Sequence, residues 1–115
     1  MVFLHGGLAA ADDRAEWLVA LEPRPATVAG RLWRGGGREG TLVPESGEGV
    51  VSGVCVEVDA GRLAVLELLA EGPHQVRIEV EARVGLRLVR AVTWGVPTAS
   101  RAFHLGYRPY PRPPR

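Results

Sequence analysis

The segment from Val76 to Val84 alternates strictly between apolar and charged residues, and this pattern constrains the fold more than any other feature of the chain. Successive side chains of a β-strand point to opposite faces, so the pattern predicts a strand with one buried and one solvated face. Such strands are typical of antiparallel sheets, and residues 86–94 are the predicted partner strand across Gly85. The side chains expected to point inward are Val76, Ile78, Val80 and Ala82.

Other segments complete an α+β pattern. Further strands are predicted at residues 2–5, 26–33, 41–43 and 50–58, with a hairpin tip at residues 35–37 and with Val54, Val56 and Val58 on one face of the last strand. Helices are predicted at residues 11–21 and at residues 60–70, where Asp59 is the expected N-cap. Six strands with two short helices leave little chain for parallel crossovers, so we expect a small mixed, curved or barrel-like sheet.

Length and composition indicate one soluble domain over residues 1–115. The chain is 46% hydrophobic and has a formal net charge of +1, which argues against a disordered or polyanion-binding protein. No apolar run is long enough for a membrane span and no signal peptide is recognised, so a cytoplasmic location is expected. The one cysteine, Cys55, excludes an internal disulfide and is predicted to be an inert core thiol.

The basic residues are all arginine, 14 in number, and the chain has no lysine or asparagine. A GC-rich genome explains this bias, and a thermophilic source is an alternative.

Residues from about 97 to 115 are rich in Pro and Arg and form a predicted C-terminal tail. Its aromatic and arginine side chains could contact RNA, and its prolines could serve as a polyproline ligand. Because the net charge is only +1, we expect no nucleic-acid partner.

Near the N-terminus, the apolar run Val2-Phe3-Leu4 ends in His5-Gly6-Gly7-Leu8. A glycine turn after a strand presents several backbone N–H groups to one point, which can hold a carboxylate or another anion. This block, followed by those at residues 25–33, 53–59 and 63–72, resembles the gamma-glutamylcyclotransferase superfamily, in its gamma-glutamylamine cyclotransferase and avirulence-induced-gene-like branch. The resemblance covers about residues 2–94 and implies a compact barrel with helices beside it, a pocket at the glycine turn and a C-terminal segment wrapped over the barrel.

The resemblance also implies a reaction and a set of site residues. The family forms 5-oxoproline from gamma-glutamyl amines or peptides, in which the substrate's α-amine attacks its own γ-carbonyl. Substrate binding falls on His5, Gly6, Gly7 and Leu8, where His5 and Gly7 replace the family's tyrosine and Thr/Ser. Backbone donors must hold the developing charge, and a carboxylate must take a proton from the amine.

The proton-accepting glutamate of the family falls on Ala70 in an ungapped comparison, and on Glu71 if one residue is inserted. Glu67 falls on the family's aspartate position. The candidate catalytic residues are therefore Glu71 and Glu67, and we expect an impaired base, so the chain is either a weak cyclotransferase or a non-catalytic relative that binds a small carboxylate or a protein partner. No cofactor is expected, and because His74 and His104 share no ligand spacing with His5 or Cys55, no metal site is predicted.

Overall fold

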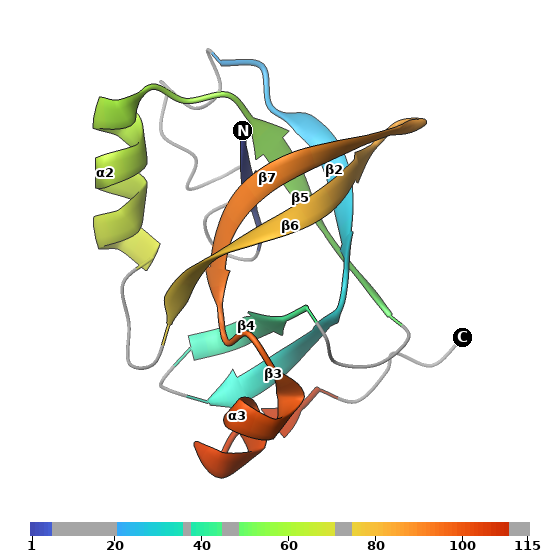
Figure 1. Cartoon of the computed structure of the whole chain (residues 1–115), viewed down its shortest axis with the longest axis vertical. Coiled ribbons are helices and arrows are strands. Elements are labelled where there is room, and N and C mark those ends of the chain that lie inside the picture. The colour runs from blue at the N-terminus through green and yellow to red at the C-terminus, as the bar shows by residue number, and fades with distance from the viewer. Residues whose placement is uncertain (6–20, 36–37, 45–48, 71–74, 111–115) are drawn as a thin grey trace.

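The protein is described from a computed structural model, which covers residues 1–5, 21–35, 38–44, 49–70 and 75–110. Its elements are β1 (Val2–Leu4), β2 (Arg24–Ala29), β3 (Arg31–Gly35), β4 (Arg38–Val43), β5 (Val50–Val56), α2 (Ala60–Ala70), β6 (Val76–Val84), β7 (Arg87–Gly95), α3 (Ala99–His104) and β8 (Arg108–Pro109). The strands form one mixed sheet, which confirms the predicted α+β class (Figure 1). Residues 11–20 of the predicted helix at 11–21 lie outside the described residues, as do residues 36–37 of the hairpin tip predicted at 35–37, whose Gly35 ends β3.

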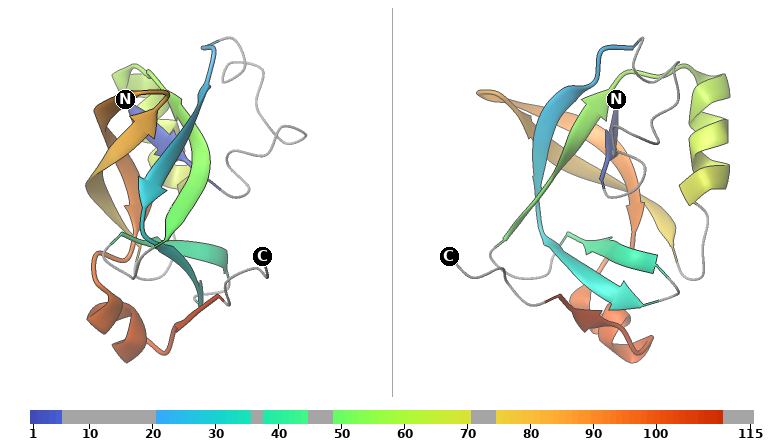
Figure 2. Two further views of the ribbon diagram at one scale, coloured as in Figure 1. Left: turned by 90° about the vertical axis from the view of Figure 1, so that its right-hand side faces the viewer. Right: turned by 180° about the vertical axis from the view of Figure 1, so that it is seen from behind.

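Five of the strands close into a barrel in the order β1, β5, β2, β6 and β7. The short strand β1 closes it, because Phe3 pairs with Cys55 of the antiparallel β5 while Val2 pairs with Val92 of the parallel β7. The N–H of Val92 also donates to the carbonyl oxygen of Met1 at 3.0 Å. The N-terminal strand is therefore central and lies beside the strand of Val54 and Val56 (Figures 1 and 2).

The barrel interior holds one large aromatic ring among small side chains. Phe3 is fully buried there. The residues around it are mostly alanine and valine: Ala26, Val28, Leu42, Val51, Cys55, Val80, Ala82 and Ala91. A barrel of five strands encloses little space, so small inward side chains are what allow a phenylalanine to fit.

Helix α2 covers the outer face of the barrel. Leu66 of α2 is 2% exposed and packs with Val2 and Leu4 of β1, Val56 of β5 and Trp94 of β7. The helix begins where the sequence predicted it, because the backbone N–H of Arg62 donates to Asp59 Oδ1 at 2.8 Å. This backbone hydrogen bond and the nearby guanidinium group of Arg62 lower the pKa of Asp59.

The prediction of one strand at residues 26–33 is wrong, because the chain bends at Gly30 into β2 and β3. The φ of Gly30 is +142°, and a Cβ atom there would lie 2.9 Å from Pro44 Cα and from the carbonyl oxygen of Val43. Only glycine tolerates both conditions readily. After the bend, β3 pairs with β4 to form a hairpin that leaves the barrel, and β4 returns to it where Leu42 pairs with Gly95.

The C-terminal segment forms a helix and a strand on this hairpin. Thr98 caps α3 by accepting the N–H of Arg101 at 3.1 Å. β8 pairs with β3, and the carbonyl oxygen of Tyr110 accepts hydrogen bonds from the Arg31 guanidinium group at 2.6 and 3.1 Å. A buried cluster joins the parts: Trp33, Val43, Val96, Ala102 and Tyr107. Residues 97–110 thus lie against the β3–β4 hairpin at one end of the barrel.

The alternation in β6 holds along most of the strand. Val80 and Ala82 are buried and Ile78 packs against the barrel core, while the intervening charged residues are exposed. Val76 is an exception: it is 41% exposed, because it pairs with Gly95, which offers no side chain to cover it. The turn to β7 has Gly85 at φ +61° followed by Leu86, which is fully exposed. Glycine at the first turn position is typical of a type II′ hairpin.

We predict opposite effects for two glycine-to-alanine substitutions. A Cβ atom at Gly95 would overlap the carbonyl oxygen of Leu42, at the point where β4 meets β7. Gly95→Ala should lower the free energy of unfolding by about 1–3 kcal/mol or more. Gly61 lies in the first turn of α2 with only an ordinary contact to Asp59, so Gly61→Ala should raise it by up to about 1 kcal/mol. Urea unfolding measures the free energy of unfolding of both variants. If Gly95→Ala leaves this free energy unchanged, the close packing of Gly95 against Leu42 is contradicted.

Candidate functional site

The ends of β1 and α2 lie toward the same end of the barrel. β1 is antiparallel to β5, and α2 follows β5 and runs back along the barrel, so it has the same general direction as β1. β1, which His5 follows, and α2, which Ala70 closes, therefore run toward the same end of the barrel (Figures 1 and 2). Two of the sequence blocks that carry the family resemblance thus lead in the same direction along the barrel.

The His5 ring points inward from the end of β1. It lies on the same side of the strand as Phe3, with the ring centroids 6.0 Å apart and the planes at 29°. Its Nδ1 atom is buried and finds no hydrogen-bond partner among the residues that the structure describes. Burial lowers the pKa of His5 from its ordinary value of 6.5, so the imidazole is neutral at pH 7. A neutral ring has one donor and one acceptor nitrogen, and a ligand group can pair with the one left unsatisfied.

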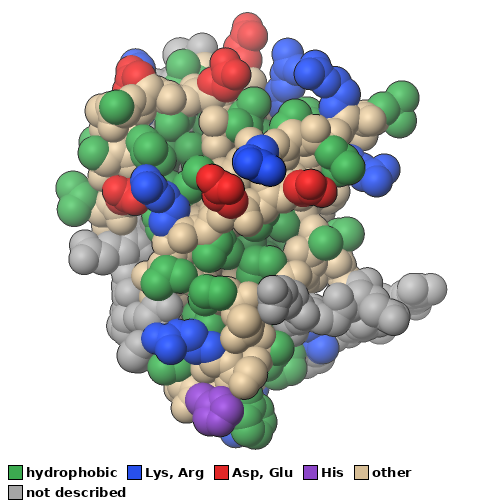
Figure 3. All heavy atoms as spheres, in the orientation of Figure 1, with side chains coloured by type: hydrophobic (Ala, Val, Ile, Leu, Met, Phe, Trp, Pro, Cys, Tyr) green, Lys and Arg blue, Asp and Glu red, His purple; other side chains and the backbone are tan. Residues whose placement is uncertain are grey.

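Glu67 is engaged at the surface. Its Oε1 lies 3.2 Å from Nη1 of Arg77, at the start of β6, and both side chains are about half exposed. Figure 3 shows a row of acidic and basic side chains across this face of the molecule. Exposed pairs of this kind contribute little to stability, typically about 0–1 kcal/mol. Glu67 thus has the setting of a surface ion pair.

The remaining predicted site residues are not placed. Gly6, Gly7, Leu8 and Glu71 lie outside the described residues. Ala70 is the last residue of α2, and its side chain is not described. The structure therefore positions His5 and Glu67, and it sets the ends of the two elements from which the other candidates continue.

One polar contact near this end was not anticipated from the sequence. Gln75, which precedes β6, donates from Nε2 to Oγ1 of Thr41 at 3.0 Å. Thr41 is 1% exposed and lies on β4. The bond joins the start of β6 to the β3–β4 hairpin. Gln75 is the one glutamine of the chain, which is the only sequence signal that sets it apart.

The described residues contain no group of three or more His, Cys, Asp or Glu side chains placed to hold a metal ion. None of the helices in the described ranges is long and apolar enough to cross a membrane.

Comparisons with protein-family models, with curated proteins and with solved structures find no match to this chain. The strand pairing shows a small α+β protein with a five-stranded barrel.

A cavity of about 460 Å³ lies at the other end of the barrel, around Met1 and Cys55. Neither His5 nor any residue of α2 lines it. Phe3 stands between Met1 and His5 on the inward side of β1 and separates the two ends. This cavity was not predicted from the sequence.

The buried imidazole predicts a pH dependence of stability. Because the folded pKa of His5 is lowered, the unfolded chain binds more protons as the pH falls below about 6.5. The His5 contribution to the free energy of unfolding should therefore decrease as the pH falls, by at most about 1.4 kcal/mol for each pH unit. His5→Gln should remove this component, as measured by urea unfolding between pH 5 and pH 8.

His104→Gln is the matched control, since it removes an exposed histidine of α3 and keeps His5. It should preserve the component that His5→Gln removes. If the two variants show the same pH dependence as the unchanged protein, the assignment of a lowered pKa to His5 is wrong.

Proposed function

We propose that this protein is gamma-glutamylcyclotransferase-like and binds a gamma-glutamyl compound or another small carboxylate at the end of β1. The observation that carries the proposal is the shared direction of β1 and α2, which adjoin the Gly6-Gly7 and Glu71-Gly72 segments in the sequence. The buried Nδ1 of His5, which has no hydrogen-bond partner among the described residues, adds a polar group that a ligand could engage. The closed small barrel with a central first strand agrees with the architecture that the resemblance implies.

In the proposed reaction, the substrate's α-amine attacks its γ-carbonyl carbon and forms the C–N bond of a five-membered ring. The bond from that carbon to the leaving nitrogen breaks, which releases 5-oxoproline and an amine or amino acid. The proton lost by the attacking amine goes to a base, and the leaving nitrogen takes up a proton. The backbone N–H groups of Gly6 and Gly7 are the proposed donors for the carbonyl oxygen as it becomes negative.

The proposed site has no well-placed general base. Ala70 stands at the family's glutamate position and carries no group that can take a proton. Glu67 is already paired with Arg77 at the surface. Glu71 serves as a base only if the comparison needs an inserted residue. We therefore propose weak or absent cyclotransferase activity.

We predict that Ala70→Glu creates or raises the release of 5-oxoproline from gamma-glutamyl amines. A positioned general base typically contributes about 10²–10⁴ in rate, so even a poorly placed carboxylate should be detectable. The matched control is Ala64→Glu, the same substitution at an exposed position of the same helix, which should have no effect. Product formation is measured by chromatography of 5-oxoproline.

Two results would redirect this assignment. Activity in the unchanged protein that is abolished by Glu71→Gln or Glu67→Gln, and is unaffected by Ala70→Glu, would identify that glutamate as the base. Equal gains from Ala70→Glu and Ala64→Glu would show that the added charge, not its position, is responsible.

The second candidate function is carboxylate binding without catalysis, which the alanine at position 70 and the ion pair of Glu67 favour. We predict that 5-oxoproline shifts the NMR signals of His5 and that Gly6→Val weakens this binding while the protein stays folded. Gly61→Ala, on the far end of α2, is the control and should bind normally. If 5-oxoproline binds neither the unchanged protein nor the Gly61→Ala variant, the proposal of a ligand at the end of β1 fails. A protein partner is then the alternative function.

A further inference from the structure

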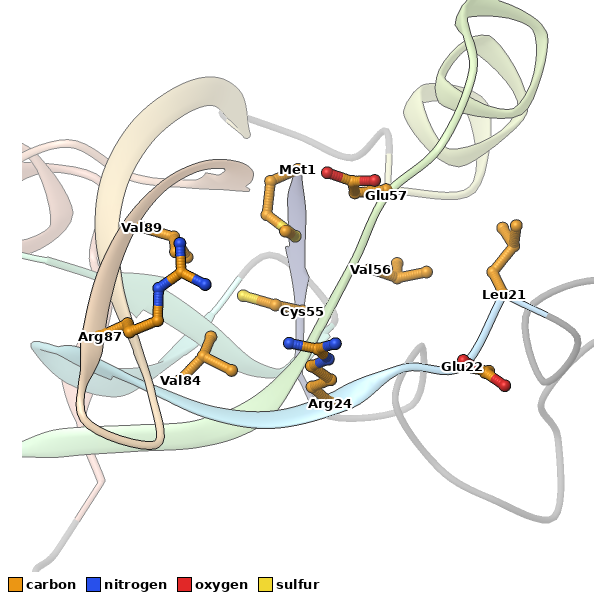
Figure 4. A pocket seen from close by; sticks show the side chains of 10 residues that line it. All are labelled: Met1, Leu21, Glu22, Arg24, Cys55, Val56, Glu57, Val84, Arg87 and Val89. Carbon is orange, nitrogen blue, oxygen red and sulfur yellow. The ribbon is translucent and has the colours of Figure 1, made fainter.

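The cavity at the Met1 end is the mouth of the barrel, and its charged residues occupy positions that face inward. Arg24 pairs with Cys55, whose side chain points into the barrel, and directly paired residues share a face of the sheet. Arg87 likewise pairs with Val84, which packs against the barrel core. Arg24 begins β2 and Arg87 begins β7, so the two arginines are the inward-facing residues of these strands that lie nearest the mouth. Figure 4 shows them reaching the cavity from two sides, with the Cys55 thiol between them.

The side chains of Arg24 and Arg87 are unpaired in the described part of the chain. Within the ranges that the structure describes, neither Arg24 nor Arg87 forms an ion pair or a hydrogen bond through its side chain. Glu57 also lines the mouth, beside Met1, while Glu22 extends away from Arg24 (Figure 4). The lining thus contains two guanidinium groups and two carboxylates, and neither carboxylate pairs with Arg24 or Arg87 among the described residues. A carboxylate placed between the two arginines would relieve the repulsion between them.

Apart from the two arginines and the two glutamates, the residues that line the cavity have apolar side chains. Val84, Val89 and Cys55 form its inner wall. Burial raises the pKa of the Cys55 thiol, so it is uncharged and behaves as a small apolar group. A volume of about 460 Å³ is within the range of small-molecule sites, which often lie in the mouths of barrels. Guanidinium groups prefer carboxylates, which they can bind through paired N–H donors.

We propose that the mouth of the barrel binds a small monocarboxylate with an apolar body, its carboxylate between Arg24 and Arg87 and its chain against Val89. This site is distinct from the one proposed at His5, because Phe3 fills the barrel between them. It needs no catalytic group and works as a binding site alone.

The test is a titration of the full chain with hexanoate, followed by calorimetry and by amide NMR. Hexanoate should bind and shift the signals of Cys55 and Val89, with little change at His5. Arg24→Gln and Arg87→Gln should each weaken binding about tenfold, as expected for loss of a charge-assisted hydrogen bond. Arg90→Gln is the matched control, since Arg90 is exposed on β7 at an outward position opposite Glu81, and it should change the affinity less than about twofold.

Two further ligands separate the sources of affinity. Hexan-1-ol has the same apolar body without the charge and should bind at least about tenfold more weakly than hexanoate. Inorganic phosphate has charge without an apolar body and should also bind more weakly. The proposal is overturned if hexanoate fails to bind, if the Arg24→Gln/Arg87→Gln double variant binds it normally, if either comparison ligand binds as tightly, or if the shifts centre on His5.

Discussion

Closure of the barrel by β1 is the interaction on which the rest of the structure depends. This strand has three residues, yet it pairs with β5 on one side and with β7 on the other. Its inward residue, Phe3, fills the barrel, and its outward residues, Val2 and Leu4, form the surface on which Leu66 of α2 packs. The same strand therefore determines the interior, the position of the helix and the direction in which His5 points.

The barrel offers two separate chemical environments. At the end of β1, a neutral imidazole stacks on Phe3 and is followed in the sequence by Gly6 and Gly7. At the opposite mouth, two arginines stand above an apolar wall. Small inward residues leave room for Phe3 between these ends, so a ligand at one end has no open path to the other. One buried side chain, Phe3, in this way separates the two ends of a narrow barrel.

Elements that depend on neighbouring residues could be predicted from the sequence. β6 has the predicted bounds because its alternation is local, and α2 begins where predicted because Asp59 caps it within one turn. The bend at Gly30 could not be read, since it depends on the close approach of Pro44. The strand β8 was missed for a similar reason, because a two-residue strand exists only through its partner β3.

The candidate sites divide in the same way. That His5 ends a buried strand follows from the apolar run before it. Glu67 is exposed and paired because β6 places Arg77 beside α2, a tertiary relation that helix spacing does not contain. In the sequence, Arg24 and Arg87 look like surface arginines near strand ends. Their inward positions follow only from the strand register opposite Cys55 and Val84.

The pairing of Val2 with Val92 also has a consequence for the order of folding. The β6–β7 hairpin joins residues that are close in sequence, so it can form early at a small cost in chain entropy. β1 precedes the other described strands in the chain but acquires its second neighbour only when β7 is complete. During synthesis Phe3 therefore lacks its full enclosure until β7 has been made.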